Sequence, residues 1–224
     1  THGDSEGVLE AFGQAARRVK AAGFDGIQLH AAHGYLIAQF NSPHTNRRSD
    51  AWGGSDAKRA RFFLEVLART RREVGDRFPI LTKMNADDCL PGGLTPALSA
   101  DICRRIAEAG IDAIELSAWT AEADPALQPS RPVDPAPAAE GYYADACRTV
   151  RRLLPRGVPL GTCGGWRSAG VMNRLIEEDG FEFVTASRPF IAEPDLVSRL
   201  RAGQSRAVCN SCNECIERRT GLVF

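Results

Sequence analysis

The sequence has no excess of charge of either sign and no long hydrophobic run. Its 28 basic and 28 acidic residues cancel, so the chain lacks the net charge that attracts nucleic acids or anionic membranes. No apolar stretch approaches the roughly 18 residues of a membrane span, and the first residues lack the basic start and apolar middle of a signal peptide. We therefore expect a cytoplasmic protein that acts on a small-molecule substrate, with no nucleic-acid or membrane partner.

The cysteine content also lacks the pattern of a disulfide framework. The seven cysteines are odd in number, and three of them crowd into "CNSCNEC" as Cys209, Cys212 and Cys215. This clustering suits reduced thiols or a metal better than disulfides. The spacing matches the start of a bacterial iron–sulfur motif, but a fourth cysteine does not follow. We expect inert or metal-scavenging thiols here and no complete iron–sulfur cluster.

The sequence does contain a repeated pattern of a helix followed by a strand. The segments "KAAGFDGIQL", "AEAGIDAIEL" and "EEDGFEFVTA" each read as the end of an amphipathic helix, a glycine, an acidic residue and then a strand. Two more strands, at 79–85 and 158–165, follow helices at 59–74 and 143–154. Five alternations of this kind predict an α/β fold with a parallel sheet or barrel.

Several of these strands carry polar residues on one face. Gln28 and His30 alternate with apolar neighbours, and Glu115 and Ser117 do the same in a later strand. If the apolar face meets the helices, the polar face lines the inside of a barrel near its C-terminal mouth. Buried charges without partners cost several kcal/mol, so a polar cofactor is expected inside. Five strands form either an open sheet or the C-terminal part of a longer (β/α)8 TIM barrel.

The stretch "QLHAAHGYL" places two histidines three residues apart at the end of a strand. Side chains alternate between the faces of a strand, so His30 and His33 converge only if the strand stops between them. Both can also be satisfied core or loop histidines, or ligands of a zinc ion.

Two further stretches predict a phosphate site. "TCGGWRS" places Gly164 and Gly165 between a strand and a helix, where exposed N–H groups can hold a phosphate. Ser187 and Arg188 follow the last strand, and arginine is well shaped to bind phosphate. Paired phosphate-binding elements after the last two strands are a recurring barrel arrangement. The proline- and alanine-rich segment 124–140 is expected to be a flexible loop over the barrel mouth.

The chain also resembles a known family. The similarity is carried by "GFDGIQLHAAHGYLIAQFNSPHTNRRSDAWGGSDAKRARF", "VPLGTCGGWRS", "VTASRPFIAEPDL" and "CNSCNEC". These stretches resemble the Old Yellow Enzyme family of flavin oxidoreductases, also called the NADH:flavin oxidoreductase group. The resemblance implies an FMN-binding (β/α)8 barrel, of which this chain matches only the later part, the fourth through eighth strands.

The resemblance also implies roles for individual residues. His30 and His33 match the pair that hydrogen-bonds the acceptor oxygen of the ligand, and Tyr35 matches the proton donor. Lys83 stands where many members carry an arginine beside the flavin pyrimidine, although it can equally pair with Glu115. The implied FMN phosphate site consists of Gly164, Gly165, Ser187 and Arg188.

From these observations the sequence predicts an FMN-dependent oxidoreductase of the ene-reductase type. It transfers hydride from NADH or NADPH to an activated alkene, with residues 1–207 as a partial barrel and 208–224 as a cysteine-rich tail. One alternative is a non-catalytic or incomplete barrel fragment that needs a second chain. As partners besides the small-molecule substrate, a homo-oligomer and a missing N-terminal barrel segment stay open. Another is a phosphate-binding lyase that uses Lys83 as a Schiff base.

Overall fold

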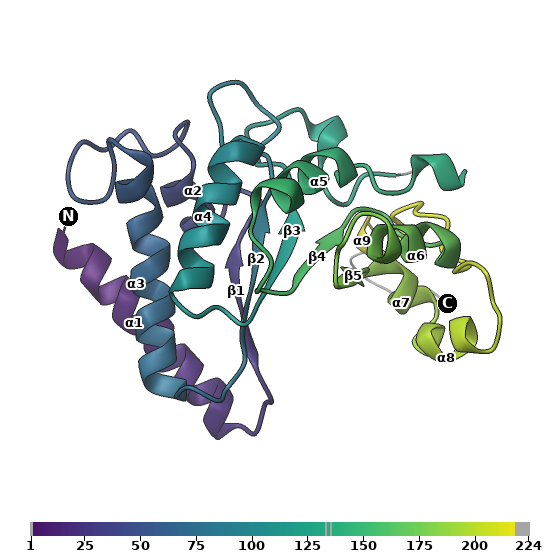
Figure 1. Ribbon diagram of the computed structural model, residues 1–224, viewed down its shortest axis with the longest axis horizontal. Coiled ribbons are helices and arrows are strands. Elements are labelled where there is room, and N and C mark those ends of the chain that lie inside the picture. The colour runs from purple at the N-terminus through teal and green to yellow at the C-terminus, as the bar shows by residue number, and fades with distance from the viewer. Residues whose placement is uncertain (1, 133, 135, 218–224) are drawn as a thin grey trace.

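The fold alternates parallel strands with helices, as the sequence predicts. The computed structural model describes residues 2–132, 134 and 136–217 (Figure 1). The elements are α1 (His2–Ala21), β1 (Ile27–Ala31), α2 (Leu36–Asn41), α3 (Asp56–Val74), β2 (Ile80–Asn85), α4 (Pro96–Glu108), β3 (Ala113–Ser117), α5 (Ala144–Leu153), β4 (Leu160–Cys163), α6 (Ala169–Glu177), β5 (Phe183–Thr185), α7 (Arg188–Ala192), α8 (Leu196–Arg201) and α9 (Glu214–Glu217), with short 3-10 turns at Pro125–Leu127 and Pro137–Ala139.

The five strands form one parallel sheet in the order β1-β2-β3-β4-β5. A sequential order of parallel strands is the arrangement found in a (β/α) barrel. In a doubly wound sheet, by contrast, the order of the strands reverses at a switch point. The pairing aligns one residue of each strand in a row across the sheet: His30, Lys83, Glu115, Gly161 and Phe183. The α/β class and the partial barrel are therefore confirmed.

The two faces of the sheet differ in polarity. Ile80, Met84 and Ile114 are fully buried on the face that packs against the helices, and α1 lies against α3 on that side (Figure 1). On the other face, Gln28 and His30 of β1 are exposed. This is the division that the alternation of polar and apolar residues predicts, and it leaves a polar inner face available for a ligand.

Local signals fix where the longer helices begin. Ser55 caps α3 and accepts a hydrogen bond from the Lys58 N–H, and Thr95 caps α4 in the same way, with Pro96 directly after it. Hydroxyl caps and a proline in the first turn are the usual features of a helix start. Among the residues that the structure describes, no helix is both long and apolar enough to cross a membrane.

Candidate functional site

The loop after β1 makes a sharp turn at His33 and Gly34. Both residues have positive φ, 60° at His33 and 76° at Gly34. The main-chain N–H of His33 donates to Asn85 Oδ1 at 3.1 Å, which ties the loop to the end of β2. A Cβ atom on Gly34 would lie 2.6 Å from Thr120 Oγ1, so both the backbone angle and the available space require glycine.

This turn brings the predicted histidines and tyrosine together. The ring centroids of His30 and His33 are 5.4 Å apart, and those of His30 and Tyr35 are 4.8 Å apart. Tyr35 is 60% exposed, so its hydroxyl is available to a ligand. The strand ends at Ala31 and α2 starts at Leu36, so His33 lies on the loop between them, as the sequence predicts.

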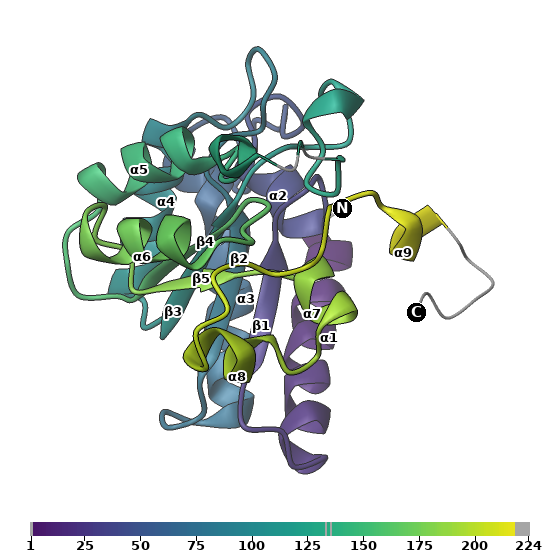
Figure 2. The ribbon, with the colours of Figure 1, turned by 90° about the vertical axis from the view of Figure 1, so that its right-hand side faces the viewer.

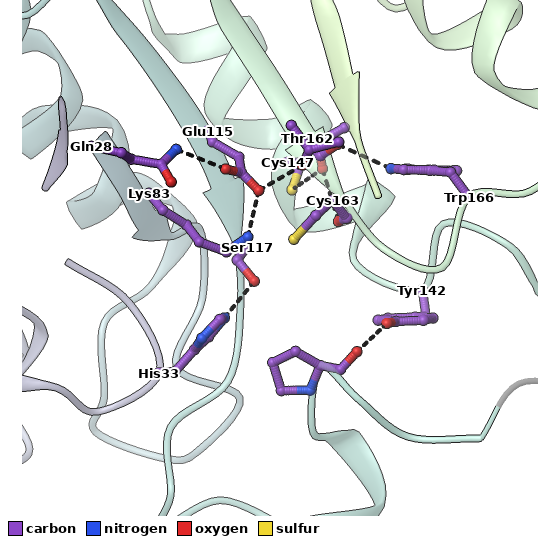
Figure 3. A network of polar contacts seen from close by, with 12 residues as sticks. Gln28, His33, Lys83, Glu115, Ser117, Tyr142, Cys147, Thr162, Cys163 and Trp166 are labelled. Carbon is purple, nitrogen blue, oxygen red and sulfur yellow. Dashed lines mark hydrogen bonds and ion pairs between the residues drawn. The ribbon is translucent and has the colours of Figure 1, made fainter. Parts of the chain in front are cut away.

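His33 is held in the neutral state at neutral pH. Its Nε2 atom lies 2.7 Å from Ser117 Oγ (Figure 3). Burial, together with the positive charge of Lys83 and the neighbouring His30, lowers the pKa of His33 to about 4. Burial and Lys83 also lower the pKa of His30. Neutral imidazoles beside a fixed cation can donate hydrogen bonds to an acceptor oxygen without carrying a charge of their own.

Lys83 and Glu115 form the polar centre of the inner face (Figure 3). Glu115 is 5% exposed and accepts hydrogen bonds from the Lys83 ammonium, from Thr185 Oγ1 at 2.6 Å and from Gln28 Nε2 at 2.9 Å. Burial raises the pKa of Glu115, but Lys83 and these hydrogen bonds outweigh it, so the pKa lies below its ordinary value. The pairing with Glu115, which the sequence left open as an alternative for Lys83, is therefore present.

The charge of Lys83 is also fixed by its surroundings. Burial lowers its pKa, but the neighbouring Cys163 and Glu115 outweigh this effect, so the pKa lies above its ordinary value. Glu115 supplies the negative charge at neutral pH, because burial raises the pKa of the Cys163 thiol. Lys83 thus stays an ammonium ion at the bottom of the site.

A cavity of about 270 Å³ connects this polar centre with the predicted phosphate residues. Its lining includes Lys83, Glu115, Cys163, Gly164, Gly165, Arg167, Thr185, Ser187, Arg188 and Ser211. All four predicted phosphate residues therefore meet Lys83 in one cavity. His33 and Tyr35 line a second cavity together with Trp119, and Lys83 of the first cavity contributes to the lowered pKa of both histidines.

The cavity has an end that suits an anion. Arg167 is 1% exposed, and its Nε and Nη1 atoms have no hydrogen-bond partner among the described residues. Its nearest carboxylate, Glu140, lies 3.8 Å away. Burial lowers the pKa of Arg167, and Arg206 and Arg188 add to this effect although Glu140 opposes it. The Arg167 Nη2 group donates to the Asp134 carbonyl at 2.8 Å, and its positive charge lies in the same cavity lining as that of Arg188, so this end of the cavity suits an anion.

Sequence reasoning missed Arg167 even though it lies within the quoted "TCGGWRS". The residue follows a Gly-Gly turn, and nothing in its sequence neighbourhood indicates burial. Gly165 was predicted for its N–H group, and the structure adds a steric reason. Its φ is 77°, and a Cβ there would lie 2.6 Å from Tyr142 Cε1.

The three clustered cysteines do not form a metal site in the described part of the chain. Cys209, Cys212 and Cys215 are free, and no group of three His, Cys, Asp or Glu residues that is described has the arrangement to hold a metal ion. Of the predicted tail 208–224, residues 218–224 lie outside the described residues.

Comparison with known proteins gives one consistent match. A family model for the NADH:flavin oxidoreductase / NADH oxidase family matches residues 1–206. An NADH oxidase of Thermoanaerobacter brockii is 35% identical over 215 residues, which are 95% of this chain and 32% of that protein. An NADPH dehydrogenase of Geobacillus thermodenitrificans is 38% identical over 177 residues, 77% of this chain and 48% of the relative.

Solved structures extend the match to the fold. A 2-naphthoyl-CoA reductase in complex with 2-naphthoyl-CoA has a TM-score of 0.83 at 28% identity and covers 96% of this chain. Morphinone reductase in complex with tetrahydroNAD has a TM-score of 0.71 at 27% identity and covers 92%. The chain spans 32% of the first of these proteins and 51% of the second. The similarity thus covers nearly all of this chain but only a part of each solved protein.

Proposed function

Because this chain belongs to the NADH:flavin oxidoreductase / NADH oxidase family, we propose that it forms part of an FMN-dependent oxidoreductase that passes hydride from NADH or NADPH to an activated alkene of the enone type. FMN, when bound, supplies the hydride transfer between the nicotinamide and the acceptor. The residues of this chain bind the cofactor, orient the acceptor and provide the proton.

Gly164, Gly165, Ser187 and Arg188 would hold the FMN phosphate. All four line the same cavity as Lys83, and Arg167 adds a further positive charge to its lining, which favours an anion. The combination of a glycine turn after one strand and an arginine after the next is an arrangement that barrel enzymes use for phosphates. Lys83 would place a positive charge beside the flavin ring.

His30 and His33 would donate hydrogen bonds to the carbonyl oxygen of the acceptor, and Tyr35 would protonate its α-carbon. Hydrogen bonds to an oxygen that gains negative charge stabilise the transition state more than the ground state. The neutral state of His33 supports this role. In a neutral imidazole one ring nitrogen carries a proton and can donate it in a hydrogen bond, while the other nitrogen can accept a hydrogen bond from the Ser117 hydroxyl.

The observation that carries the proposal is the convergence of these groups. The His30–His33–Tyr35 cluster, the Lys83–Glu115 pair and the predicted phosphate residues come from distant parts of the sequence, yet they meet at the C-terminal ends of the strands. Enzymes with this fold class have their active sites at that edge.

The geometry does not favour the lyase that forms a Schiff base through Lys83. A lysine acts as a nucleophile when its pKa is lowered, whereas the pKa of Lys83 is raised by its neighbours despite burial. Its pairing with Glu115 keeps the amine protonated, and such a reaction would also leave His30, His33 and Tyr35 without a role.

Stopped-flow kinetics under anaerobic conditions test the proposed reaction. The protein is loaded with FMN, reduced with NADH or NADPH, and then mixed with 2-cyclohexen-1-one while the flavin absorbance is followed. We expect bleaching by the nicotinamide and recovery of the absorbance with the enone. If the bound FMN is reduced by the nicotinamide but is not reoxidised by the enone, the proposed alkene acceptor is wrong. The assignment to the flavin oxidoreductases would not be affected by that result.

A further inference from the structure

The segment that follows α8 turns back and leads to α9 (Figure 2). The Ala207 N–H donates to the Arg167 carbonyl at 2.8 Å, and the Val208 N–H donates to Glu193 Oε2 at 2.6 Å. Arg206 pairs with Ser168 in an isolated antiparallel bridge. Beyond these anchors, Ser211 lies in the cavity wall. The start of the tail is therefore attached to the loops that carry the predicted phosphate residues.

Asn213 is the residue through which this tail contacts Arg188. Its side chain is buried, with 6% of the residue exposed. Its Oδ1 atom accepts a hydrogen bond from Arg188 Nη1 at 2.6 Å, and its Nδ2 group donates to the Ser130 carbonyl. The backbone of Asn213 is left-handed, with φ 68°, a conformation that asparagine tolerates better than most residues.

These contacts occupy one edge of the Arg188 guanidinium. Nη1 also donates to the Arg131 carbonyl at 3.0 Å, and the Ser130 and Ser211 carbonyls lie farther off, at 3.5 and 3.4 Å. Arg188 is 8% exposed and lines the cavity. Among the described residues, Asn213 and the three carbonyls are all reached from Nη1, and Tyr142, which lines the same cavity, also interacts with the guanidinium. A guanidinium that offers two N–H groups in a fixed plane is suited to phosphate.

The chemistry of the amide matters for this arrangement. Asparagine fixes the guanidinium through a neutral oxygen, so Arg188 keeps its full positive charge. A carboxylate at the same place would form an ion pair with Arg188 and would weaken its attraction for a second anion. The amide nitrogen of Asn213 donates to the Ser130 carbonyl. Asn213 thereby connects three segments that are distant in sequence: the tail, the loop at Ser130 and the start of α7 at Arg188.

We propose that Asn213 is a positioning residue for FMN: by holding Nη1 of Arg188, it aims the rest of the guanidinium at the FMN phosphate. This inference rests on the proposed function, because it takes FMN as the ligand of the cavity. It assigns the beginning of the cysteine-rich tail to the cofactor site, independently of any role for the cysteines.

FMN and riboflavin differ only in the phosphate group, so the test compares the dissociation constants of these two flavins. Flavin fluorescence is titrated with the wild-type chain and with the variants Asn213→Gly and Asn213→Asp. Glycine removes the amide but tolerates the positive φ, so its effect reports the side chain and not backbone strain. Asn210→Gly is the matched control, since Asn210 is exposed and its Oδ1 accepts from the Cys212 N–H in the same segment.

We expect Asn213→Gly to weaken FMN binding by about tenfold, the usual scale for one hydrogen bond to a charged group, and Asn213→Asp to weaken it further. Riboflavin binding and the control variant should match the wild type. The inference is overturned if both flavins are weakened equally, as a merely structural role would do, or if FMN binding is unchanged. A wild-type chain that does not prefer FMN over riboflavin, or that binds neither, contradicts the phosphate site of the proposed function and the inference with it.

Discussion

Tyr35 and His33 lie close together but differ in what surrounds them. Tyr35 is exposed at the mouth of the site, whereas His33 is tied to Ser117 and Asn85. The exposed hydroxyl can reach a bound acceptor, and the fixed imidazole can orient it. Tyr35, the proposed proton donor, is therefore the residue whose removal should affect only one half of the proposed reaction.

Replacing Tyr35 by phenylalanine should slow the alkene half-reaction by about 10²- to 10⁴-fold, the usual contribution of a general acid. Reduction of the flavin by NADH or NADPH should keep its wild-type rate, because that step requires no proton from Tyr35. Stopped-flow measurement of each half-reaction separates the two. Equal losses in both would show that Tyr35 supports the structure of the site and is not the proton donor.

The lowered pKa of His33 predicts a stability that depends on pH. With a pKa of about 4 in the folded protein against an ordinary 6.5, protonation favours the unfolded chain. The free energy of unfolding should therefore fall as the pH decreases from 6.5 towards 4, by up to about 3 kcal/mol from this residue. Urea denaturation at several pH values should show a shallower fall in His33→Gln.

The Lys83–Glu115 pair predicts an asymmetric response to substitution. Glu115→Gln should lower the free energy of unfolding by about 1–3 kcal/mol, because it leaves a half-buried ammonium without its counter-charge. The double variant Glu115→Gln/Lys83→Met should recover part of this loss, since it also removes the cation. Chemical denaturation gives the coupling energy. If the effects of the two single substitutions on the free energy of unfolding simply add, the two side chains do not stabilise each other. Glu122→Gln, which removes a carboxylate from an exposed ion pair, serves as the control.

Individual residues were predicted from the sequence only where a motif names them. His30, His33, Tyr35, Lys83 and the four predicted phosphate residues belong to recognisable stretches. All of them except His30 line one of two cavities, and the His30 ring lies beside those of His33 and Tyr35. Arg167 and Asn213 were not singled out, because their importance comes from contacts across the chain. The Arg167 side chain contacts Asp134 and Glu140, about 30 positions earlier, and Asn213 contacts a residue 25 positions away.

At the scale of elements, the loop between β1 and α2 is the part most constrained by local geometry. It holds His33 and Gly34 in left-handed conformations and presents Tyr35 immediately before α2. The constraint on Gly34 combines a backbone angle with a close contact to Thr120. These two contributions can be separated because the chain contains glycines with the same angle and no close neighbour.

Gly34→Ala should destabilise the protein by more than Gly92→Ala. Gly92 has φ 74° with nothing within 4 Å of an added Cβ, so its substitution measures the effect of the positive φ alone, about 1–2 kcal/mol. Gly34→Ala adds the contact with Thr120 Oγ1, and Gly34→Ala/Thr120→Ala should recover that additional part. Thermal or urea unfolding measures all three. Equal losses at the two glycines would mean that the loop shifts freely and does not fix His33.

The regular elements followed well from periodicity, because each strand is preceded by an amphipathic helix and a glycine. The strand predicted at 158–165 is shorter in the structure, with β4 at Leu160–Cys163; the Gly164–Gly165 turn ends the pairing, and an apolar pattern does not mark that point. The short helices α2, α7, α8 and α9 were not predicted. Four to six residues show too little of a 3.6-residue period to be recognised.

For the molecule as a whole, the polar inner face of an otherwise ordinary α/β fold is the feature that leads to a cofactor. The cavity on this face is lined by three positively charged side chains: Lys83 of β2, Arg167 after β4 and Arg188 after β5. Composition alone predicted the small-molecule partner, and alternation within strands predicted the polar face. Which ligand the face holds came only from motifs that resemble the family, since a polar cavity suits many cofactors.

Equilibrium binding of FMN to the purified chain, followed by quenching of the flavin fluorescence, tests most directly whether this cavity is a flavin site. We predict saturable binding of one FMN per chain, weakened by about tenfold or more in Arg188→Ala through loss of a charged hydrogen bond. A folded chain that binds no FMN, or one whose affinity for FMN is unchanged by Arg188→Ala, would contradict the account.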